Sequence, residues 1–133
     1  MNRHRAREQA FNIIFEKLFN EDVQTEKLFE LGVAEGLFEE DEFSISLAGL
    51  TESKSGEIDK LIEENSIGWR LSRLPKVSLA VLRLAVCEML YIEDVPVSVS
   101  INEAVELAKK YGTGEDASFI NGVLGTIAKS IEV

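Results

Sequence analysis

Residues 76–92 most restrict how this chain can fold, because almost every position in the segment is apolar. The segment reads KVSLAVLRLAVCEMLYI, which is long for a strand but ordinary for a helix. Arg83 and Glu88 interrupt the run, and this argues against a membrane span. A helix that is apolar around most of its circumference needs neighbours on nearly all sides. We therefore predict that residues 76–92 form the central helix of a bundle.

The other apolar residues recur at intervals of three and four, which predicts amphipathic helices around the central one. We expect helices at residues 3–19, 24–32, 39–52 and 53–65, another from Ser100 to Gly112, and a last one that includes Phe119 and Ile131. No strand pair or internal repeat is evident, and the length of 133 residues suits one compact domain. The fold class predicted is all-α, with six or seven helices.

Short polar motifs predict where the last two helices begin and end. Ser100 and Glu103 have the spacing of a capping box, which would start a helix at Ser100. Gly112 suits a left-handed terminator for that helix. Residues 113–118, TGEDAS, are expected to form a short turn before the last helix.

Charge is distributed very unevenly along the chain. The formal net charge is −10, yet residues 1–20 hold four basic and two acidic side chains. Residues 21–66 hold fourteen acidic and three basic ones. A protein that coats nucleic acid would be basic throughout, so any anion-binding surface here must be local. The densest positive cluster is Arg3, His4, Arg5 and Arg7 at the start of the first helix, and it reads either as a solvated terminus or as a phosphate-binding arm.

The residues offer little for catalysis. Cys87 is the single cysteine and His4 the single histidine, and they are far apart in the sequence. Cys87 lies within the apolar run, where a small buried hydrophobe is the favoured role, and a lone cysteine suits a reducing cytoplasm. No set of residues has metal-ligand spacing, so no enzyme activity, cofactor or metal is predicted.

Two aromatic residues and several cations are candidates for binding single-stranded RNA. Tyr111 and Phe119 flank the last expected turn, beside Lys109 and Lys110. Such rings either pack in the core or provide platforms on which unpaired bases stack. Arg70, Arg73 and Lys76 form a further cluster that reads equally well as ordinary surface charge.

Four stretches taken together resemble the NusB family of bacterial transcription antitermination factors. In order they are ARE near the start, LRLAVCEMLY, VPVSVSINEAVELAKKYG and SFINGVL. The resemblance covers nearly the whole chain, although residues 20–66 match mainly in length and helical pattern. It implies an all-helical, non-enzymatic protein built from two packed subdomains, here residues 1–68 and 69–133, which form one compact domain.

The resemblance also implies partners. Family members bind boxA, a single-stranded RNA element, as a heterodimer with the ribosomal protein NusE. This complex helps RNA polymerase resist premature termination, notably on ribosomal RNA operons. Some relatives also self-associate through the face that NusE uses, so the resemblance allows a homodimer of the free protein.

Individual residues are carried over by matching motifs. The family's basic arm corresponds to Arg3, His4, Arg5 and Arg7, with His4 where an arginine is common. The RNA-contacting turn before the last helix corresponds to Tyr111, Gly112 and Phe119. An aromatic residue that faces NusE corresponds to Phe15, and Ser78 stands where some relatives place an acid toward NusE.

The leading hypothesis is therefore an RNA-binding adaptor that acts with NusE in the antitermination complex. The alternative is a purely protein-binding helical module without RNA contact, with the acidic residues 21–66 as its docking surface.

Overall fold

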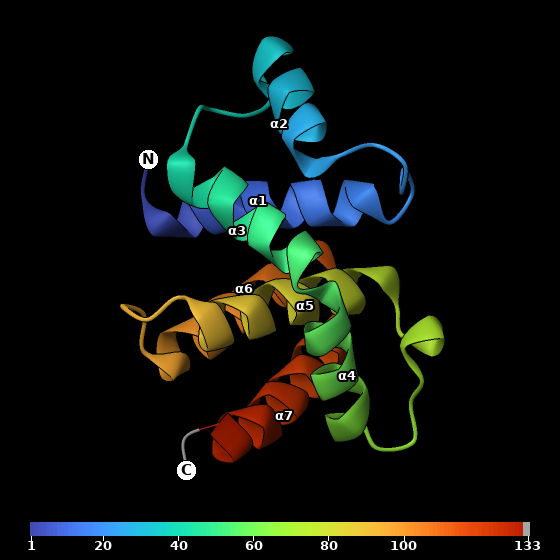
Figure 1. Ribbon diagram of the computed structural model, residues 1–133. Helices are drawn as coiled ribbons and strands as arrows, with labels where there is room; N and C mark the ends of the chain where they lie inside the picture. The colour runs from blue at the N-terminus through green and yellow to red at the C-terminus, as the bar shows by residue number, and fades with distance from the viewer. Residues whose placement is uncertain (132–133) are drawn as a thin grey trace.

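The computed structural model describes residues 1–131, and helices are the only regular secondary structure within them. The elements are α1 (Arg3–Lys17), α2 (Thr25–Ala34), α3 (Glu42–Ser53), α4 (Ser55–Asn65), the 3₁₀ turn η1 (Leu71–Arg73), α5 (Lys76–Tyr91), α6 (Val97–Tyr111) and α7 (Gly114–Ile131) (Figure 1). The prediction of an all-α fold is confirmed. None of the helices in the described residues has both the length and the apolar character needed to cross a membrane.

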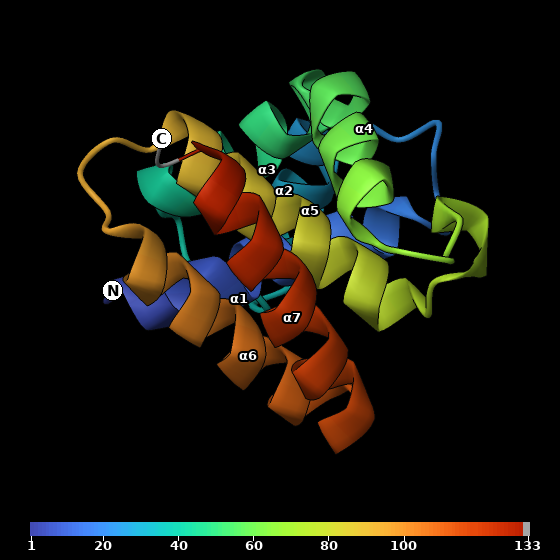
Figure 2. The same ribbon diagram turned by 90° about the horizontal axis from the view of Figure 1, so that it is seen from below.

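Helix α5 occupies the centre of the molecule, as its composition predicted. Eleven of its sixteen residues are buried, among them Leu82 and Val86 with no exposed surface. It packs against α1, α3, α4, α6 and α7 (Figure 2). Five neighbouring helices explain why nearly every position of α5 is apolar.

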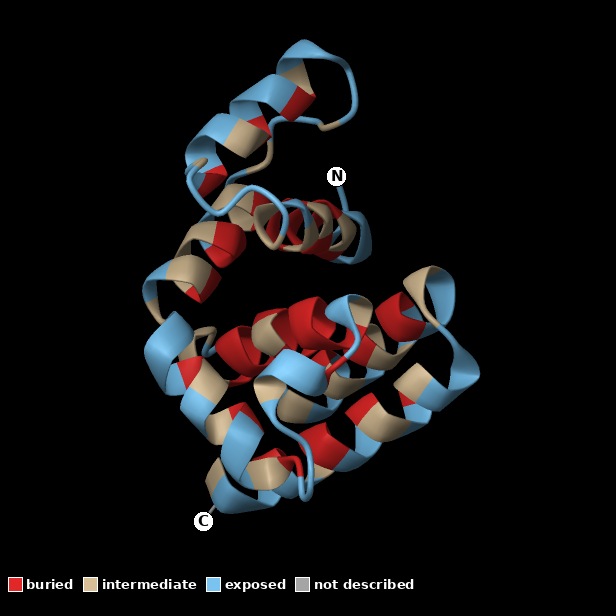
Figure 3. Ribbon diagram, turned by 90° about the vertical axis from the view of Figure 1, so that its right-hand side faces the viewer, coloured by how far each residue is buried: buried red, intermediate tan, exposed pale blue. Residues whose placement is uncertain are grey.

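The helices form two groups that share α5 (Figure 3). Helices α1, α2 and α3 pack on one another, and α5, α6 and α7 form the second group. Helix α4 packs mainly on α5 and α7. Buried side chains from both groups make one continuous core, including Phe11, Leu47 and Ile120.

The expected capping box at Ser100 is wrong. Helix α6 begins three residues earlier, at Val97, with Pro96 as its N-cap. The Ser100 hydroxyl instead donates a hydrogen bond to Glu88 Oε1 at 3.1 Å, across the interface with α5. Glu103 points to the side chains of α1. Both side chains of the Ser100–Glu103 motif therefore bind residues on other helices instead of capping α6.

The capping box lies thirteen residues further along, at the start of α7. Thr113 N donates to Asp116 Oδ2 at 2.8 Å, and Asp116 N donates to Thr113 Oγ1 at 3.1 Å. This reciprocal pair starts the helix at Gly114, so the expectation of a turn over residues 113–118 is wrong. Gly112 ends α6 as expected but at φ −124°, which is not left-handed. A Cβ there would lie 2.6 Å from Asp116 Oδ2, so a larger residue would displace this carboxylate.

Candidate nucleic-acid interface

The first turn of α1 exposes Arg3 and Arg5 on a capped helical backbone. Asn2 Oδ1 accepts a hydrogen bond from Arg5 N at 2.9 Å, which satisfies a helix N-terminal donor. Arg3 Nη2 lies 3.6 Å from Asp94, and Arg5 Nη2 lies 3.4 Å from Glu39. Exposed ion pairs of this kind contribute little to stability and are screened by salt. Both guanidinium groups can therefore exchange a carboxylate for a phosphate at small cost.

His4 lies between these arginines and contacts two acidic side chains. Its Nδ1 is 2.7 Å from Glu103 on α6, and its Nε2 is 3.7 Å from Glu8 one turn along α1. The imidazole is half exposed. His4 thus shares the exposed edge with Arg3 and Arg5 and also links α1 to α6.

Arg7 is the exception among the predicted arm residues, because only 4% of its surface is exposed. Its Nε and Nη2 donate to both carboxylate oxygens of Glu88 at 2.9 and 2.6 Å, and Nη1 lies 3.6 Å from Glu103. Burial alone would lower the pKa of Arg7, but the hydrogen bonds and charge of Glu88 outweigh burial and raise the pKa. The position of Arg7 does not support direct contact with RNA. Instead, Arg7 joins α1 to α5.

Tyr111 and Lys110 meet α1 at the far end of α6. The Tyr111 ring stacks on Phe11 with centroids 4.7 Å apart, and its hydroxyl donates to Glu8 Oε2 at 3.1 Å. Lys110 donates to the same carboxylate oxygen. The hydrogen bond from Lys110 is the largest cause of a lowered pKa for Glu8, with the Tyr111 hydroxyl adding to it. The half-buried Tyr111 ring is accordingly held in place.

Phe119 lies on α7 next to an aromatic residue that sequence reasoning missed. Trp69 and Phe119 are edge-to-face, with centroids 6.2 Å apart and an interplanar angle of 69°. Half of the Trp69 surface is exposed, and the two rings line a cavity of about 230 Å³ together with Pro75. The position of Trp69 in a linker beside basic residues is the signal that could have identified it.

The basic side chains that follow Trp69 differ from Arg3 and Arg5 in their lack of acidic partners within the described residues. Arg70, Arg73 and Lys76 form no ion pair with any acidic side chain among residues 1–131. All three are exposed. Lys76 Nζ lies 5.8 Å from the Phe19 ring centroid, within range of a cation–π contact. Exposed rings beside unpaired cations are what single-stranded nucleic acid requires of a protein surface.

The two residues carried over as partner contacts lie in different environments. Phe15 is half-buried in a row of rings, 5.7 Å from Phe11 and 5.3 Å from the exposed Phe19. Ser78 is fully buried, and its hydroxyl donates to Asp116 Oδ1 at 3.1 Å. Ser78 therefore holds α5 against the start of α7, and its burial does not support direct contact with a partner.

Cys87 is unsuited to act as a nucleophile. The residue has no exposed surface, and burial raises the pKa of its thiol to about 11. Among the described residues there is also no group of three or more His, Cys, Asp or Glu side chains that could hold a metal ion. The exposed groups of this surface provide charge and stacking rather than a reacting atom.

The bundle and its exposed edge of cations and rings define an all-helical binding protein. The NusB family model matches residues 4–129. A transcription antitermination protein NusB of Carboxydothermus hydrogenoformans is 43% identical over 138 residues, covering 99% of this chain and 96% of that protein. The chain belongs to the NusB family.

Solved structures of the family share the fold. T. maritima NusB superposes with a TM-score of 0.82 at 34% identity, covering 97% of this chain and 92% of that one. A crystal structure of the antitermination factors NusB and NusE in complex with dsRNA contains a chain with a TM-score of 0.85 and 28% identity. The alignment covers 98% of this chain and 99% of that one.

Proposed function

We propose that this protein binds boxA-type single-stranded RNA together with NusE and acts in the antitermination complex of RNA polymerase, where it supports transcription of ribosomal RNA. The observation that carries the proposal is the exposed arm of Arg3, His4 and Arg5, which lies on the capped first turn of α1 and whose arginines form only exposed ion pairs with acidic side chains. The solved NusB and NusE pair with dsRNA, which has the same fold, supports this choice of partners.

RNA contact is divided between charge and stacking in this proposal. The arm and the unpaired Arg70, Arg73 and Lys76 bind phosphates, which supplies an affinity that falls with salt. The Phe119 and Trp69 rings stack on unpaired bases. Tyr111 and Gly112 form the end of α6, from which the chain turns into α7. Arg7 acts through the packing of α1 and does not touch the RNA.

NusE is assigned to the face of α1 that carries Phe15. The row from Phe11 to the exposed Phe19 offers apolar surface of the kind that protein partners bury. Ser78 is not assigned a contact with NusE, because it is fully buried and bonded to Asp116. The same face serves self-association when NusE is absent.

No catalytic step is part of the proposed function, and the site of action is the cytoplasm. The buried Cys87 with its raised pKa and the engagement of His4 with Glu103 and Glu8 support a non-enzymatic role. We infer no requirement for a metal or cofactor.

A binding experiment tests the proposal. The affinity of a boxA-like single strand is measured with and without NusE over a salt series, beside a duplex of the same sequence. Arg3→Ala with Arg5→Ala should weaken binding of the single strand and reduce the salt slope by about one to two. The control, Lys27→Ala with Lys60→Ala, removes two exposed charges elsewhere and should bind as the native chain does. Equal affinities of the arm variant and the control would refute the role of the arm.

The second candidate is a helical module that binds protein only. The exposed Phe19 and the acidic residues 21–66 favour it, because both can serve a protein partner without RNA. It predicts that NusE binds normally while the single strand shows no affinity above that of a scrambled RNA, either with NusE or without it.

A further inference from the structure

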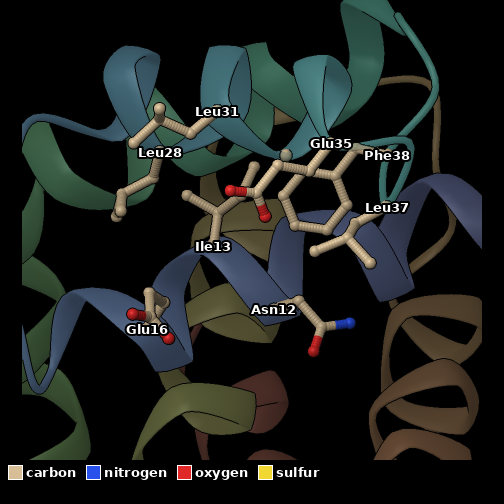
Figure 4. Close-up of a pocket in the computed structure, with 9 residues that line it drawn as sticks. Asn12, Ile13, Glu16, Leu28, Leu31, Glu35, Leu37 and Phe38 are labelled. Carbon is tan, nitrogen blue, oxygen red and sulfur yellow. The ribbon is translucent and has the colours of Figure 1, made fainter.

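A second surface lies beside α1 and is lined by none of the rings of the Phe15 row. Helices α1 and α2 and the segment after α2 enclose a groove of about 530 Å³ (Figure 4). Its apolar wall is made of Leu28, Leu31, Leu37 and Phe38. Leu31 is 46% exposed and Leu37 is 72% exposed, which is a large apolar exposure for one small site.

The wall of this groove is rigidly built. After α2, the N–H groups of Leu37 and Phe38 both donate to Gly32 O, at 2.8 and 3.1 Å. Gly36 makes this turn possible with a φ of +77°. The Phe38 ring covers Gly32 so closely that a Cβ there would lie 2.1 Å from it, and it stacks on Phe29. The chain is thus held in a turn that presents Leu37 to solvent.

The rim of the groove is acidic. Figure 4 shows the Glu35 carboxylate pointing into the groove toward Ile13, with Glu16 at the other end. Within residues 1–131 neither carboxylate has an ion-pair partner, and Glu16 only accepts a hydrogen bond from Asn20. No lysine or arginine lines the groove.

These charges select among the possible occupants. RNA and anionic lipid surfaces carry negative charge, which the unpaired carboxylates repel. A second copy of this chain would also bring acid against acid, because the net charge is −10 and residues 21–66 are the most acidic part. A partner that is both cationic and apolar complements the acidic rim and the apolar wall of the groove.

We propose that the groove between α1 and α2 is a docking site for a basic amphipathic helix of a partner protein. Two or three apolar side chains at helical spacing lie against Leu31, Leu37 and Phe38, and flanking lysines or arginines reach Glu16 and Glu35. This site does not depend on the proposed RNA function, because it uses none of the residues assigned to RNA or NusE.

The probe is a labelled amphipathic peptide of about 18 leucine and lysine residues, with a scrambled peptide of the same composition as its reference. Binding to the full chain is followed by fluorescence anisotropy, and the site is located by amide chemical shifts. We expect tighter binding of the amphipathic peptide, with shifts confined to α1, α2 and residues 35–38.

Two pairs of variants test the apolar and acidic parts separately. Leu37→Ser should weaken binding by about tenfold, because a leucine that is buried on docking is lost. Ile67→Ser changes an even more exposed residue (92%) outside the groove and should have no effect. Glu35→Gln should weaken binding by about two- to fivefold at low salt, whereas Glu64→Gln, an exposed acid on α4, should not.

Three outcomes would overturn the proposal. One is equal affinity for the amphipathic and the scrambled peptide. Another is equal affinity of the native chain and Leu37→Ser. The third is sedimentation showing a dimer of the native chain that Leu37→Ser converts to monomer, which would assign the groove to self-association. Leu37→Ser should also bind boxA-like RNA as the native chain does, so a failure of this proposal is distinguishable from a failure of the RNA function.

Discussion

At the scale of single residues, Arg7 and Glu88 show how a surface prediction became an interior contact. They are 81 positions apart and form a two-point ion pair at 4% and 2% exposure. Glu88 also accepts from Ser100, so three helices meet at one carboxylate. A buried pair of this kind specifies which faces of the helices meet, while removal of one partner leaves an uncompensated charge.

Removing the Glu88 carboxylate alone should therefore reduce the stability of the fold, because it leaves Arg7 buried without its partner. We expect Glu88→Leu to lower the free energy of unfolding by about 3–5 kcal/mol, measured by urea denaturation. Arg7→Met combined with Glu88→Leu should recover much of this loss, because neither charge then remains buried. A double variant whose loss equals the sum of the two single losses would contradict this account.

Glu8 gives the stability of the chain a dependence on pH. Its pKa is lowered in the folded state by the hydrogen bond from Lys110, so its contribution is present above its unfolded pKa and is lost as the pH falls. Between about pH 5 and pH 3, the free energy of unfolding should fall less in Glu8→Gln than in the native chain. Glu106→Gln, which removes an exposed carboxyl 3.8 Å from Lys109, is the control and should follow the native slope more closely.

At the scale of elements, α7 begins where a reciprocal cap satisfies its first donors. Thr113→Ala should lower the free energy of unfolding by about 1 kcal/mol, because Asp116 N loses its acceptor. Ser118→Ala, at an exposed position within the same helix, should be neutral or slightly stabilising. Thermal or urea unfolding of the two variants measures the difference, and identical losses would show that the cap is not what stabilises the start of α7.

At the scale of the whole molecule, the two helix groups share one core through α5. We expect Leu82→Ala to cost about 2–5 kcal/mol and to leave a single cooperative transition, because Leu82 is fully buried in the continuous core. Trp69 fluorescence reports on the second group and hydrogen exchange of α1 amides on the first. Loss of α1 protection at lower denaturant than the Trp69 signal would show that the groups unfold separately.

Much of the fold could be predicted from the sequence, because the spacing of apolar residues along the chain shows which face of each helix is buried. The apolar run of residues 76–92 indicated the central helix, and α5 is Lys76–Tyr91. Local hydrogen bonding was less predictable, because Ser100–Glu103 and Thr113–Asp116 have the same spacing and only one pair caps a helix. The choice depends on which side chains find tertiary partners.

The candidate site could be predicted only in part. The sequence by itself determined that the chain is helical, that α5 is central, and that positive charge gathers at the start of α1. Those properties depend on residue type and spacing, which are local. Only the tertiary structure decided that Arg7 turns inward to Glu88, that Ser78 is covered, and that Trp69 joins Phe119. Such pairings depend on which segments meet across the core, and residue spacing along the chain does not encode that directly.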